Sequence, residues 1–232
     1  MATRTRQVAE TAEIVWREGG GPVSARFDDP YFSLQDGLAE TRHVFLAGNG
    51  LPERMHAGFH IAELGFGTGL NLLAAWQCWL ETGLPGRLRF TSFEAYPMRA
   101  ADMARALGAF PALAPLTAPL LEAWSRGETR LVTESLEAQV ILGDARARLP
   151  EWTGRADAWF LDGFAPARNP ELWDAALLRE VARHTAPGGS FATYTAAGHI
   201  RRALAQAGFA VTRLPGYGTK RHMTAGRLER HP

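Results

Sequence analysis

The 232-residue sequence predicts an α/β fold in which a mostly parallel seven-stranded sheet carries helices on both faces and one antiparallel strand at an edge. Short apolar segments of strand length alternate with longer segments whose apolar residues repeat with a helical period. The first strand of the series runs directly into a glycine-rich turn that opens a helix. The last two strand segments follow one another without a helix, which indicates an antiparallel strand.

The chain before this series is predicted to be an extension, residues 1–59, that packs on a main domain formed by residues 60–232. The extension is rich in turn sequences, such as Gly-Gly-Gly-Pro at 19–22 and Gly-Asn-Gly at 48–50. Its first twenty residues mix both charges and contain no apolar signal-peptide core.

The first half of the main domain is predicted as strand, helix, strand and helix. The expected strands span 60–64 and 88–94, and the expected helices span 70–81 and 97–107. The proline-rich segment 110–127 fits neither pattern clearly, because its prolines interrupt both periods.

The second half continues the alternation after two short strands, 129–133 and 138–142, whose spacing is compatible with a hairpin. Residues 156–161 are predicted as a buried strand. A helix is then expected from Asn169 as N-cap and Pro170 at the first helical position to about residue 184.

A Pro-Gly-Gly turn follows that helix and introduces the last part of the sheet. The remaining elements are a strand at 190–194, a helix at 197–207 that ends before a glycine, and a hairpin pair at 209–214 and 223–228.

The bulk composition points to a cytoplasmic protein. No apolar run approaches the roughly 18 residues of a membrane span. The single cysteine, Cys78, lies in an apolar helical pattern and has no internal disulfide partner, which predicts a reducing compartment and a buried thiol.

Charge is nearly balanced overall, at +1, but it is unevenly distributed. From residue 194 onward the only acid is Glu229, whereas the basic residues are Arg201, Arg202, Arg213, Lys220, Arg221, Arg227 and Arg230. This asymmetry is compatible with a polyanionic partner. It is equally compatible with positive charge that balances acids elsewhere on the surface.

The glycine-rich turn carries the first chemical signal. Residues 61–71 read Ile-Ala-Glu-Leu-Gly-Phe-Gly-Thr-Gly-Leu-Asn, so that glycines occupy positions 65, 67 and 69. A dinucleotide-binding turn has the spacing G-x-G-x-x-G and directs amides at a pyrophosphate. Here the spacing is G-x-G-x-G and acidic Glu63 precedes it, which suits a cationic sulfonium rather than a pyrophosphate. The turn therefore favours S-adenosylmethionine over NAD.

Three further strand ends carry acids at the edge where such a sheet binds ligands. Glu94 closes the second strand and is placed to accept hydrogen bonds from ribose hydroxyls. Asp144 follows an apolar strand and is a candidate acceptor for a hydrogen bond from the adenine amino group. Asp162 follows the apolar strand 156–161, which places it at the side of the sheet where the reaction would occur. Each acid alone is also common as a helix cap or turn residue. Four such positions on one edge indicate the Rossmann-like fold of class I methyltransferases.

Four longer motifs carry a family resemblance. Residues 29–42 read Asp-Pro-Tyr-Phe-Ser-Leu-Gln-Asp-Gly-Leu-Ala-Glu-Thr-Arg, and 157–170 read Asp-Ala-Trp-Phe-Leu-Asp-Gly-Phe-Ala-Pro-Ala-Arg-Asn-Pro. Together with 63–71 and with Gly-Tyr-Gly-Thr-Lys-Arg-His-Met at 216–223, they resemble the methyltransferase half of the MnmC family of tRNA-modifying proteins. The similarity extends from about residue 27 to residue 228.

This resemblance implies methylation of the amine of 5-aminomethyl-2-thiouridine at the tRNA wobble position, giving 5-methylaminomethyl-2-thiouridine, with S-adenosyl-L-methionine as the donor. Two-domain members continue into an FAD-dependent oxidase, whereas this sequence has no second glycine-rich βαβ unit and resembles stand-alone members. We therefore expect no FAD, no metal and no membrane partner. Arg168 stands where the family motif has lysine, so the charge is kept.

The expected partner is the tRNA anticodon stem-loop, and Asp162 is the expected catalytic residue. The expected cofactor-binding residues are Glu63, Gly65, Gly67, Thr68, Gly69, Asn71, Glu94, Asp144, Gln35 and Asp36. The expected substrate-binding residues are the aromatic side chains of Tyr31, Phe32 and Phe164, for stacking on the base, and the basic side chains of Arg168, Lys220 and Arg221, for phosphates. For each aromatic residue, core packing is the alternative interpretation.

Three rival functions remain open from the sequence. They are N-methylation of a small-molecule amine, aminopropyl transfer from decarboxylated S-adenosylmethionine, and tRNA binding without catalysis. The basic C-terminal quarter disfavours the first, and Asp162 lacks the paired acids expected of a polyamine pocket. The intact glycine turn and Asp162 disfavour the third.

Overall fold

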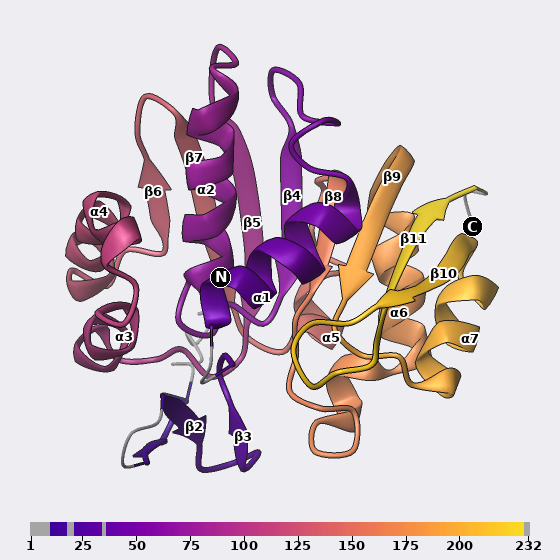
Figure 1. The fold of residues 1–232 in the computed structure, drawn as a ribbon, viewed down its shortest axis with the longest axis horizontal. Coiled ribbons are helices and arrows are strands. Elements are labelled where there is room, and N and C mark those ends of the chain that lie inside the picture. Colours follow the sequence, from indigo (N-terminus) through magenta and orange to yellow (C-terminus); the bar gives the residue numbers. More distant parts are fainter. Residues whose placement is uncertain (1–9, 18–20, 34–35, 230–232) are drawn as a thin grey trace, which may run out of the picture.

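The computed structural model describes residues 10–17, 21–33 and 36–229 and is built around one large sheet (Figure 1). The strands of this sheet are β4 (His60–Leu64), β5 (Leu88–Glu94), β6 (Arg130–Val132), β7 (Leu136–Leu142), β8 (Ala156–Leu161), β9 (Thr185–Thr193), β10 (Phe209–Pro215) and β11 (His222–Leu228). They lie in the order β10-β11-β9-β8-β4-β5-β7-β6. The predicted α/β class with a mostly parallel sheet is confirmed.

The sheet has eight strands where seven were expected, and its antiparallel strands lie at different places. Strands β9, β8, β4, β5 and β7 pair in parallel. Strand β11 is antiparallel to both of its neighbours and is therefore internal rather than an edge strand. Strand β6 is a second antiparallel strand and forms a hairpin with β7 at one edge.

Helices cover both faces of the sheet (Figure 1). The α-helices are α1 (Gly37–Thr41), α2 (Leu70–Thr82), α3 (Ala100–Leu107), α4 (Ala114–Ser125), α5 (Ala145–Arg148), α6 (Ala175–Arg183) and α7 (Gly198–Gln206). Shorter helical turns are the π-turn Arg42–Leu46 and the 3-10 turns Ala47–Asn49, Pro111–Leu113 and Pro170–Trp173.

Alternate residues of the central strands enter two separate cores, because successive side chains point to opposite faces of a strand. Ile61 packs with α2 in one core, whereas Leu64 packs with α6 and α7 in the other. In β8 the same division separates Phe160 from Trp159, and all of these side chains are buried. Burial on both faces explains why these strands read as continuous apolar runs.

The helix expected from Asn169 begins later than predicted. Residues 170–173 form the 3-10 turn, and α6 starts at Ala175 with Asp174 as its N-cap, whose carboxylate accepts from the amide of Ala176. The break lets Trp173 turn into the core, where its indole N–H donates to the carbonyl of Phe164. Asn169 makes no capping hydrogen bond with its side chain.

Other predicted boundaries also differ, since α3 begins at Ala100 rather than 97 and β7 at Leu136 rather than 138. Strand β9 begins at Thr185 rather than 190 and includes the predicted Pro-Gly-Gly turn, because a bulge between its pairings to Ala156 and Ala158 absorbs the extra residues. The ambiguous segment 110–127 forms a 3-10 turn and then α4, which contains Pro119.

The segment before β4 contributes to both a small sheet and the main core. Strands β1 (Ile14–Trp16), β2 (Pro22–Ser24) and β3 (Asp29–Pro30) form an antiparallel sheet beside the carboxyl ends of the central strands (Figure 1). Val44, Phe45 and Leu46 are buried in the same core as Phe160. This segment is therefore built into the body of the protein.

Within the described part of the chain, no single helix has the length and apolar character needed to cross a membrane. One pair, Ala100–Leu107 with Pro111–Ser125, reaches these limits only jointly and is bent by 117°.

Candidate active site

A cavity of about 900 Å³ lies at the carboxyl ends of the parallel strands, where an open α/β sheet binds its ligands. Its walls come from the glycine turn after β4, the residues that follow β5, β7 and β8, the segment 26–33 and the loop between β10 and β11. Most of the predicted site residues line it, namely Tyr31, Phe32, Gly65, Gly67, Thr68, Asn71, Glu94, Asp144, Asp162, Phe164, Arg168 and Lys220.

Four of the predicted site residues that the structure describes lie elsewhere. Gly69, Asp36, Arg221 and Glu63 are described but do not line the cavity. Asp36 is the N-cap of α1 and accepts from the amide of Ala39. Gln35 lies outside the described residues.

The glycine turn has a backbone shape that requires glycine. Gly65, Gly67 and Gly69 have φ angles of 90°, 54° and 80°. A Cβ on Gly65 would overlap the carbonyl oxygen of Asp162, because the turn lies directly against the end of β8. Gly65 and Gly67 line the cavity, so the main chain of the turn faces the space where a ligand would lie.

Asn71, on the first turn of α2, connects the two buried acids of the site. Its Nδ2 donates to Glu63 Oε1 at 2.9 Å and to Asp162 Oδ2 at 2.6 Å. Its Oδ1 accepts from the hydroxyl of Thr41 at 3.0 Å. Both N–H groups of this amide donate and its oxygen accepts, so its orientation is fixed.

Glu63 lies beneath the cavity rather than at its surface. The side chain is fully buried, and Ser92 Oγ donates to Glu63 Oε2 at 2.6 Å. Burial raises the pKa of Glu63 well above its usual value. Glu63 therefore touches the cavity only through Asn71, in contrast to the direct contact with a sulfonium that the sequence suggested.

Asp162 lies at the end of β8 and faces the cavity. Burial raises the pKa of Asp162 to about 7, while the hydrogen bond from Asn71 and the charge of Lys220 act in the opposite direction. A carboxyl that titrates near neutral pH can exchange a proton with a ligand under physiological conditions.

Lys220 enters the cavity from the loop between β10 and β11. Its Nζ lies 2.8 Å from Glu40 Oε1 and 4.2 Å from the centre of the Tyr194 ring. The Tyr194 hydroxyl donates to the carbonyl of Gly163 at 2.7 Å, which holds the ring beside Asp162. Lys220 was expected to contact phosphates, but in this arrangement its charge is paired inside the cavity.

Glu94 and Asp144 hold the opposite half of the cavity. Glu94 accepts hydrogen bonds from the amides of Gly67 and Tyr96 at 2.9 and 2.8 Å. Burial raises the pKa of Glu94, while these hydrogen bonds act to lower it. Asp144 caps α5 and pairs with Arg146 at 2.6 Å, which lowers the pKa of Asp144. Asp144 thus serves as the helix cap that the sequence left as an alternative, while still lining the cavity.

Aromatic rings form one wall. Phe27 stacks on Phe164 with ring centres 4.8 Å apart, and Tyr31 meets Phe164 edge-on at 5.1 Å. Tyr31 also lies against Gly67, so it borders the glycine turn. Phe32 packs edge-on against Phe110 at 5.1 Å, so part of its surface belongs to the core.

Seven lining aromatics were not among the predicted site residues. They are Phe27, Phe45, Phe66, Phe93, Tyr96, Tyr194 and Tyr217. Tyr96 and Tyr194 follow the ends of β5 and β9, so their position just beyond a strand was the signal that could have found them. Phe27 and Tyr217 lie in turns far apart in the chain, and the signal that could have found Tyr217 is the family motif at 216–223 that contains it.

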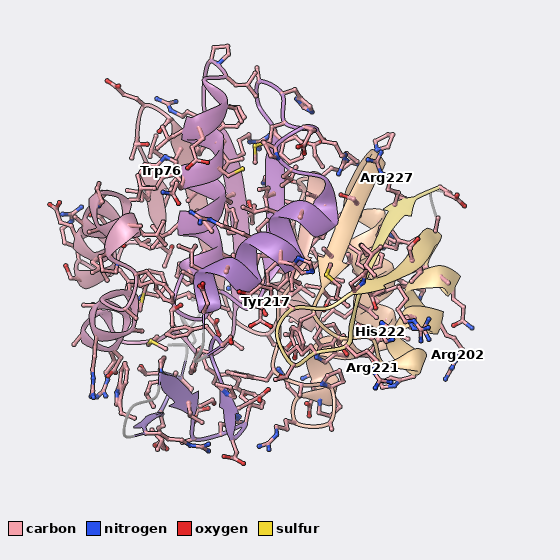
Figure 2. The ribbon with its side chains drawn as sticks, viewed as in Figure 1. Trp76, Arg202, Tyr217, Arg221, His222 and Arg227 are labelled. Carbon is pink, nitrogen blue, oxygen red and sulfur yellow. The ribbon has the colours of Figure 1, made fainter. Side chains whose placement is uncertain are left out.

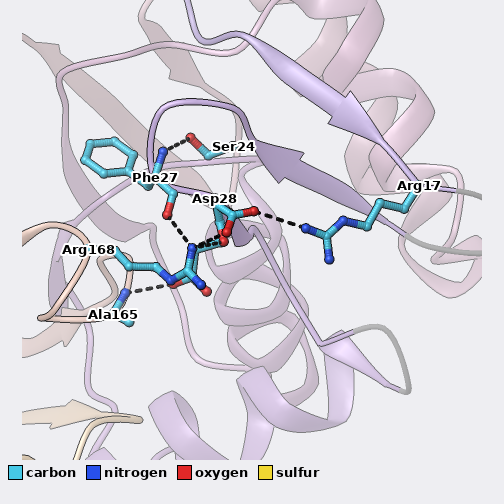
Figure 3. Close-up of polar contacts among 7 residues, drawn as sticks. Arg17, Ser24, Phe27, Asp28, Ala165 and Arg168 are labelled. Carbon is cyan, nitrogen blue, oxygen red and sulfur yellow. Dashed lines mark hydrogen bonds and ion pairs between the residues drawn. The ribbon is translucent and has the colours of Figure 1, made fainter.

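Arg168 fastens the N-terminal sheet to the loop that carries Asp162 (Figure 3). Its guanidinium pairs with Asp28 Oδ2 at 2.6 Å and donates to the carbonyls of Phe27 and Asp28. Asp28 has a φ of 46° and also pairs with Arg17 at 3.1 Å. Beside them, the Ala165 amide donates to Asp29 Oδ2 at 2.8 Å. Arg168 therefore shapes the cavity wall.

The cavity fits a nucleoside ligand with a cationic centre. The glycine turn offers open backbone, Glu94 offers carboxylate oxygens at the end of β5, and Asp162 adds an acid near the turn. Within the described residues, no group of three or more His, Cys, Asp or Glu side chains is placed to hold a metal ion.

The sequence is similar to one protein family and to several proteins that contain a related segment. The model of a family described as S-adenosyl-L-methionine-dependent methyltransferase matches residues 111–229. The tRNA 5-methylaminomethyl-2-thiouridine biosynthesis bifunctional proteins MnmC of Pseudomonas paraeruginosa and Chromobacterium violaceum are 49% and 47% identical to this chain. Each match covers 95% of this chain but only 36% and 35% of the relative, so the chain spans about a third of their length. The resemblance carried by the four motifs is confirmed.

Solved structures agree with this relationship. The crystal structure of MNMC2 from Aquifex aeolicus is 27% identical, with a TM-score of 0.76 that covers 95% of this chain and 71% of the other. The precorrin-6y C5,15-methyltransferase of Geobacter metallireducens is 12% identical with a TM-score of 0.51, over 86% of this chain and 92% of the other, and shows the fold alone. The chain belongs to the S-adenosyl-L-methionine-dependent methyltransferase family, and S-adenosyl-L-methionine is its methyl donor.

Proposed function

We propose that the protein methylates the amine of 5-aminomethyl-2-thiouridine at the wobble position of tRNA, giving 5-methylaminomethyl-2-thiouridine. The observation that carries this proposal is the position of Asp162, a carboxyl that titrates near pH 7 inside the cavity and beside the glycine turn. The names of the MnmC relatives supply the substrate that such a site would act on.

S-adenosyl-L-methionine supplies the electrophilic methyl group. An alkylamine arrives mostly protonated at neutral pH and must lose a proton before its nitrogen can form the new bond. Ionised Asp162 accepts a charge-assisted hydrogen bond from the ammonium and takes this proton. A pKa near 7 makes Asp162 a stronger base than an ordinary aspartate of pKa about 4.

Neighbouring residues fix the position of the Asp162 carboxylate and influence its pKa. Asn71 fixes one carboxylate oxygen at 2.6 Å, and the charge of Lys220 keeps the pKa from rising further. Correct placement of the amine against the donor contributes to the rate in addition to proton transfer. We assign the glycine turn and Glu94 to the donor, and Phe164 with Phe27 to the face of the uracil ring.

The test uses tRNA that carries the unmethylated aminomethyl group. Purified protein and S-adenosyl-L-methionine are incubated with this tRNA, with fully modified tRNA and with the free nucleoside, and the products are measured by mass spectrometry of the nucleosides. We expect one methyl group to be added to the wobble nucleoside of the first substrate only. Equal or faster methylation of the free nucleoside would favour a small-molecule methyltransferase, and binding of tRNA without methylation would favour a non-catalytic module.

A further inference from the structure

Three basic side chains that line the cavity form ion pairs with acids of the described residues. Arg168 is paired with Asp28, Arg146 with Asp144 and Lys220 with Glu40, at distances between 2.6 and 2.8 Å. These cations are engaged with acids of the protein itself. An anionic partner would have to displace those acids to reach them.

Residues 217–220 of the loop after β10 line another side of the cavity, and α7 begins four residues after Tyr194, which also lines it. Arg202 lies on the first turns of α7, and its Nη1 lies 3.3 Å from the position of a Cβ on Gly198. Its guanidinium is thus folded back toward the start of α7. That start follows Tyr194 at the end of β9, on the same sheet edge as the cavity.

Arg213 and Arg221 lie at the same edge. Arg213 is near the carboxyl end of β10 and shares a strand face with Val211, which packs in the same core as α7. Arg221 ends the loop, and its carbonyl accepts from the amide of Gly216 at 3.1 Å. Figure 2 shows Arg202 and Arg221 on the same side of the molecule, with Arg221 at the loop that joins β10 and β11 and Arg202 on α7.

Arg202, Arg213 and Arg221 are exposed, and none of them forms an ion pair with any residue that the structure describes. Three unpaired guanidinium groups therefore lie at the same edge of the sheet as the cavity, on α7, on β10 and in the loop after β10, without lining the cavity itself. Guanidinium groups bind phosphate oxygens in a bidentate manner and are less strongly hydrated than ammonium groups.

We propose that Arg202, Arg213 and Arg221 form a docking surface for the phosphodiester backbone of the RNA whose nucleoside enters the cavity. This inference rests on the proposed function, because it takes the macromolecule that carries the substrate amine to be a tRNA. Contacts of this kind fix the orientation of the RNA and supply salt-dependent affinity, but they do not select its sequence.

The chain offers a matched control in Arg227. This residue lies on β11, is exposed, and forms no ion pair with a described residue. Its partner in the hairpin is Ala210, near the start of β10, whereas Arg213 pairs with Thr224 near the other end. Figure 2 shows Arg227 well separated from Arg202 and Arg221. It is therefore an exposed arginine of the same hairpin that lies away from the cavity mouth.

The experiment measures binding of an anticodon stem-loop RNA by fluorescence anisotropy at several salt concentrations. It compares the wild type, Arg227→Gln, and the triple variant Arg202→Gln, Arg213→Gln, Arg221→Gln, and calorimetric titration with S-adenosyl-L-methionine checks that the cavity is intact in each. Each lost phosphate contact lowers the salt slope by about 0.7 to 0.9, so the triple variant should lose roughly 2 to 3 units of slope. Its RNA affinity should fall by tenfold or more, with Arg227→Gln close to the wild type.

The outcomes separate the two proposals. A wild-type protein that binds no RNA contradicts the proposed function and this surface together. A wild type that binds RNA with a triple variant that binds equally well contradicts only the surface. A loss of binding free energy in Arg227→Gln as large as one third of the loss in the triple variant also contradicts it, because the effect would then follow the number of charges removed rather than their position.

Discussion

Single residues determine the chemistry of the cavity through one shared amide. Asn71 donates to both Glu63 and Asp162, and Thr41 holds its oxygen. The two acids have raised pKa values because both are withdrawn from water. Only Asp162 lines the cavity, so only Asp162 can exchange a proton with a ligand there.

Replacement of Asp162 should separate catalysis from donor binding. In Asp162→Asn the proton acceptor is lost, and we expect turnover to fall by about 100-fold or more. The wild-type rate should rise with pH through about 7, as Asp162 ionises, and the variant should lack this inflection. Donor affinity, measured by calorimetry, should change little. Asp174→Asn is the control, because asparagine also caps a helix. A loss of donor affinity as large as the loss of turnover would contradict this division.

Lys220 should set the pH at which the enzyme becomes active. Lys220→Met removes the positive charge near Asp162 and leaves the negative charge of Glu40 without its partner. Both effects raise the pKa of Asp162 and so favour its protonated form. We expect the rising limb of the pH–rate profile to move to higher pH by roughly one unit. Lys220→Arg keeps the charge and should keep the wild-type profile. An unchanged profile in Lys220→Met would show that Lys220 does not act on Asp162.

At the scale of elements, the cavity exists because two connections pack tightly on the carboxyl edge of the sheet. The turn between β4 and α2 lies against the end of β8, with the Gly65 amide bonded to the Phe93 carbonyl at 2.9 Å. The small N-terminal sheet is held against the loop after β8 by Arg168 and Asp29.

The glycine turn should tolerate no side chain at Gly65. In Gly65→Ala the new methyl group would overlap the Asp162 carbonyl at a φ of 90°, and we expect a loss of more than roughly 3 kcal/mol in the free energy of unfolding. Gly86→Ala is the matched control, since Gly86 has a φ of 85° but no atom near its missing Cβ. It should cost only about 1 to 2 kcal/mol of backbone strain. Similar losses in urea unfolding would contradict the steric explanation.

The attachment of the N-terminal sheet should support donor binding. In Arg168→Met the ion pair with Asp28 and the bonds to two carbonyls are lost, which frees Phe27 and Tyr31 from the cavity wall. We expect donor affinity to fall about tenfold, the equivalent of roughly one charged hydrogen bond. Arg17→Met removes only the exposed pair with the same Asp28 and should have little effect. Normal donor binding with weaker RNA binding in Arg168→Met would instead support the phosphate role expected from the sequence.

The elements that were predicted correctly are those with a local cause. Strands β4, β5 and β8 could be predicted because burial on both faces produces continuous apolar runs. The N-cap of α6 was misplaced because Asn169-Pro170 has the pattern of a helix start, whereas the burial of Trp173 shifts the start to Asp174. No local pattern contains that tertiary contact.

In the site, too, the residues with a local sequence signal could be predicted and those placed by tertiary contacts could not. Asp162, Glu94 and the glycine turn follow strands, so their position at one edge follows from the fold. Arg168 and Lys220 form ion pairs with residues 140 and 180 positions away in the sequence. No local pattern reveals such distant partners, so both side chains were expected to be free to bind phosphate. The burial of Glu63 beneath Asn71 likewise depends on the packing of α2 against β5.

At the scale of the whole molecule, the buried ionisable groups link stability to pH in opposite directions. Burial lowers the pKa of His60 to about 4. The contribution of neutral His60 to the free energy of unfolding is therefore lost as pH falls from about 6.5 through 4. Asp162 has a raised pKa, so the folded state loses stability as pH rises from about 4 through 7.

The Asp162→Asn variant should therefore be more stable than the wild type in alkaline solution. At pH 8 the wild type carries a partly buried charge that asparagine lacks, and we expect a gain on the order of 2 kcal/mol after allowing for water in the cavity. At pH 4 the gain should nearly vanish, because Asp162 is then protonated in the folded state. The comparison is made by thermal unfolding at both pH values. A gain that does not depend on pH would contradict the assigned titration of Asp162.

The cavity wall combines Phe27 and Tyr31, which precede β4, with Tyr217 and Lys220, which follow β10. While the protein is being translated, a nascent chain that has released β4 and α2 from the ribosome still lacks the loop between β10 and β11. Such a chain lacks Tyr217 and Lys220 from the cavity wall. The wall is therefore complete only when synthesis has passed that loop.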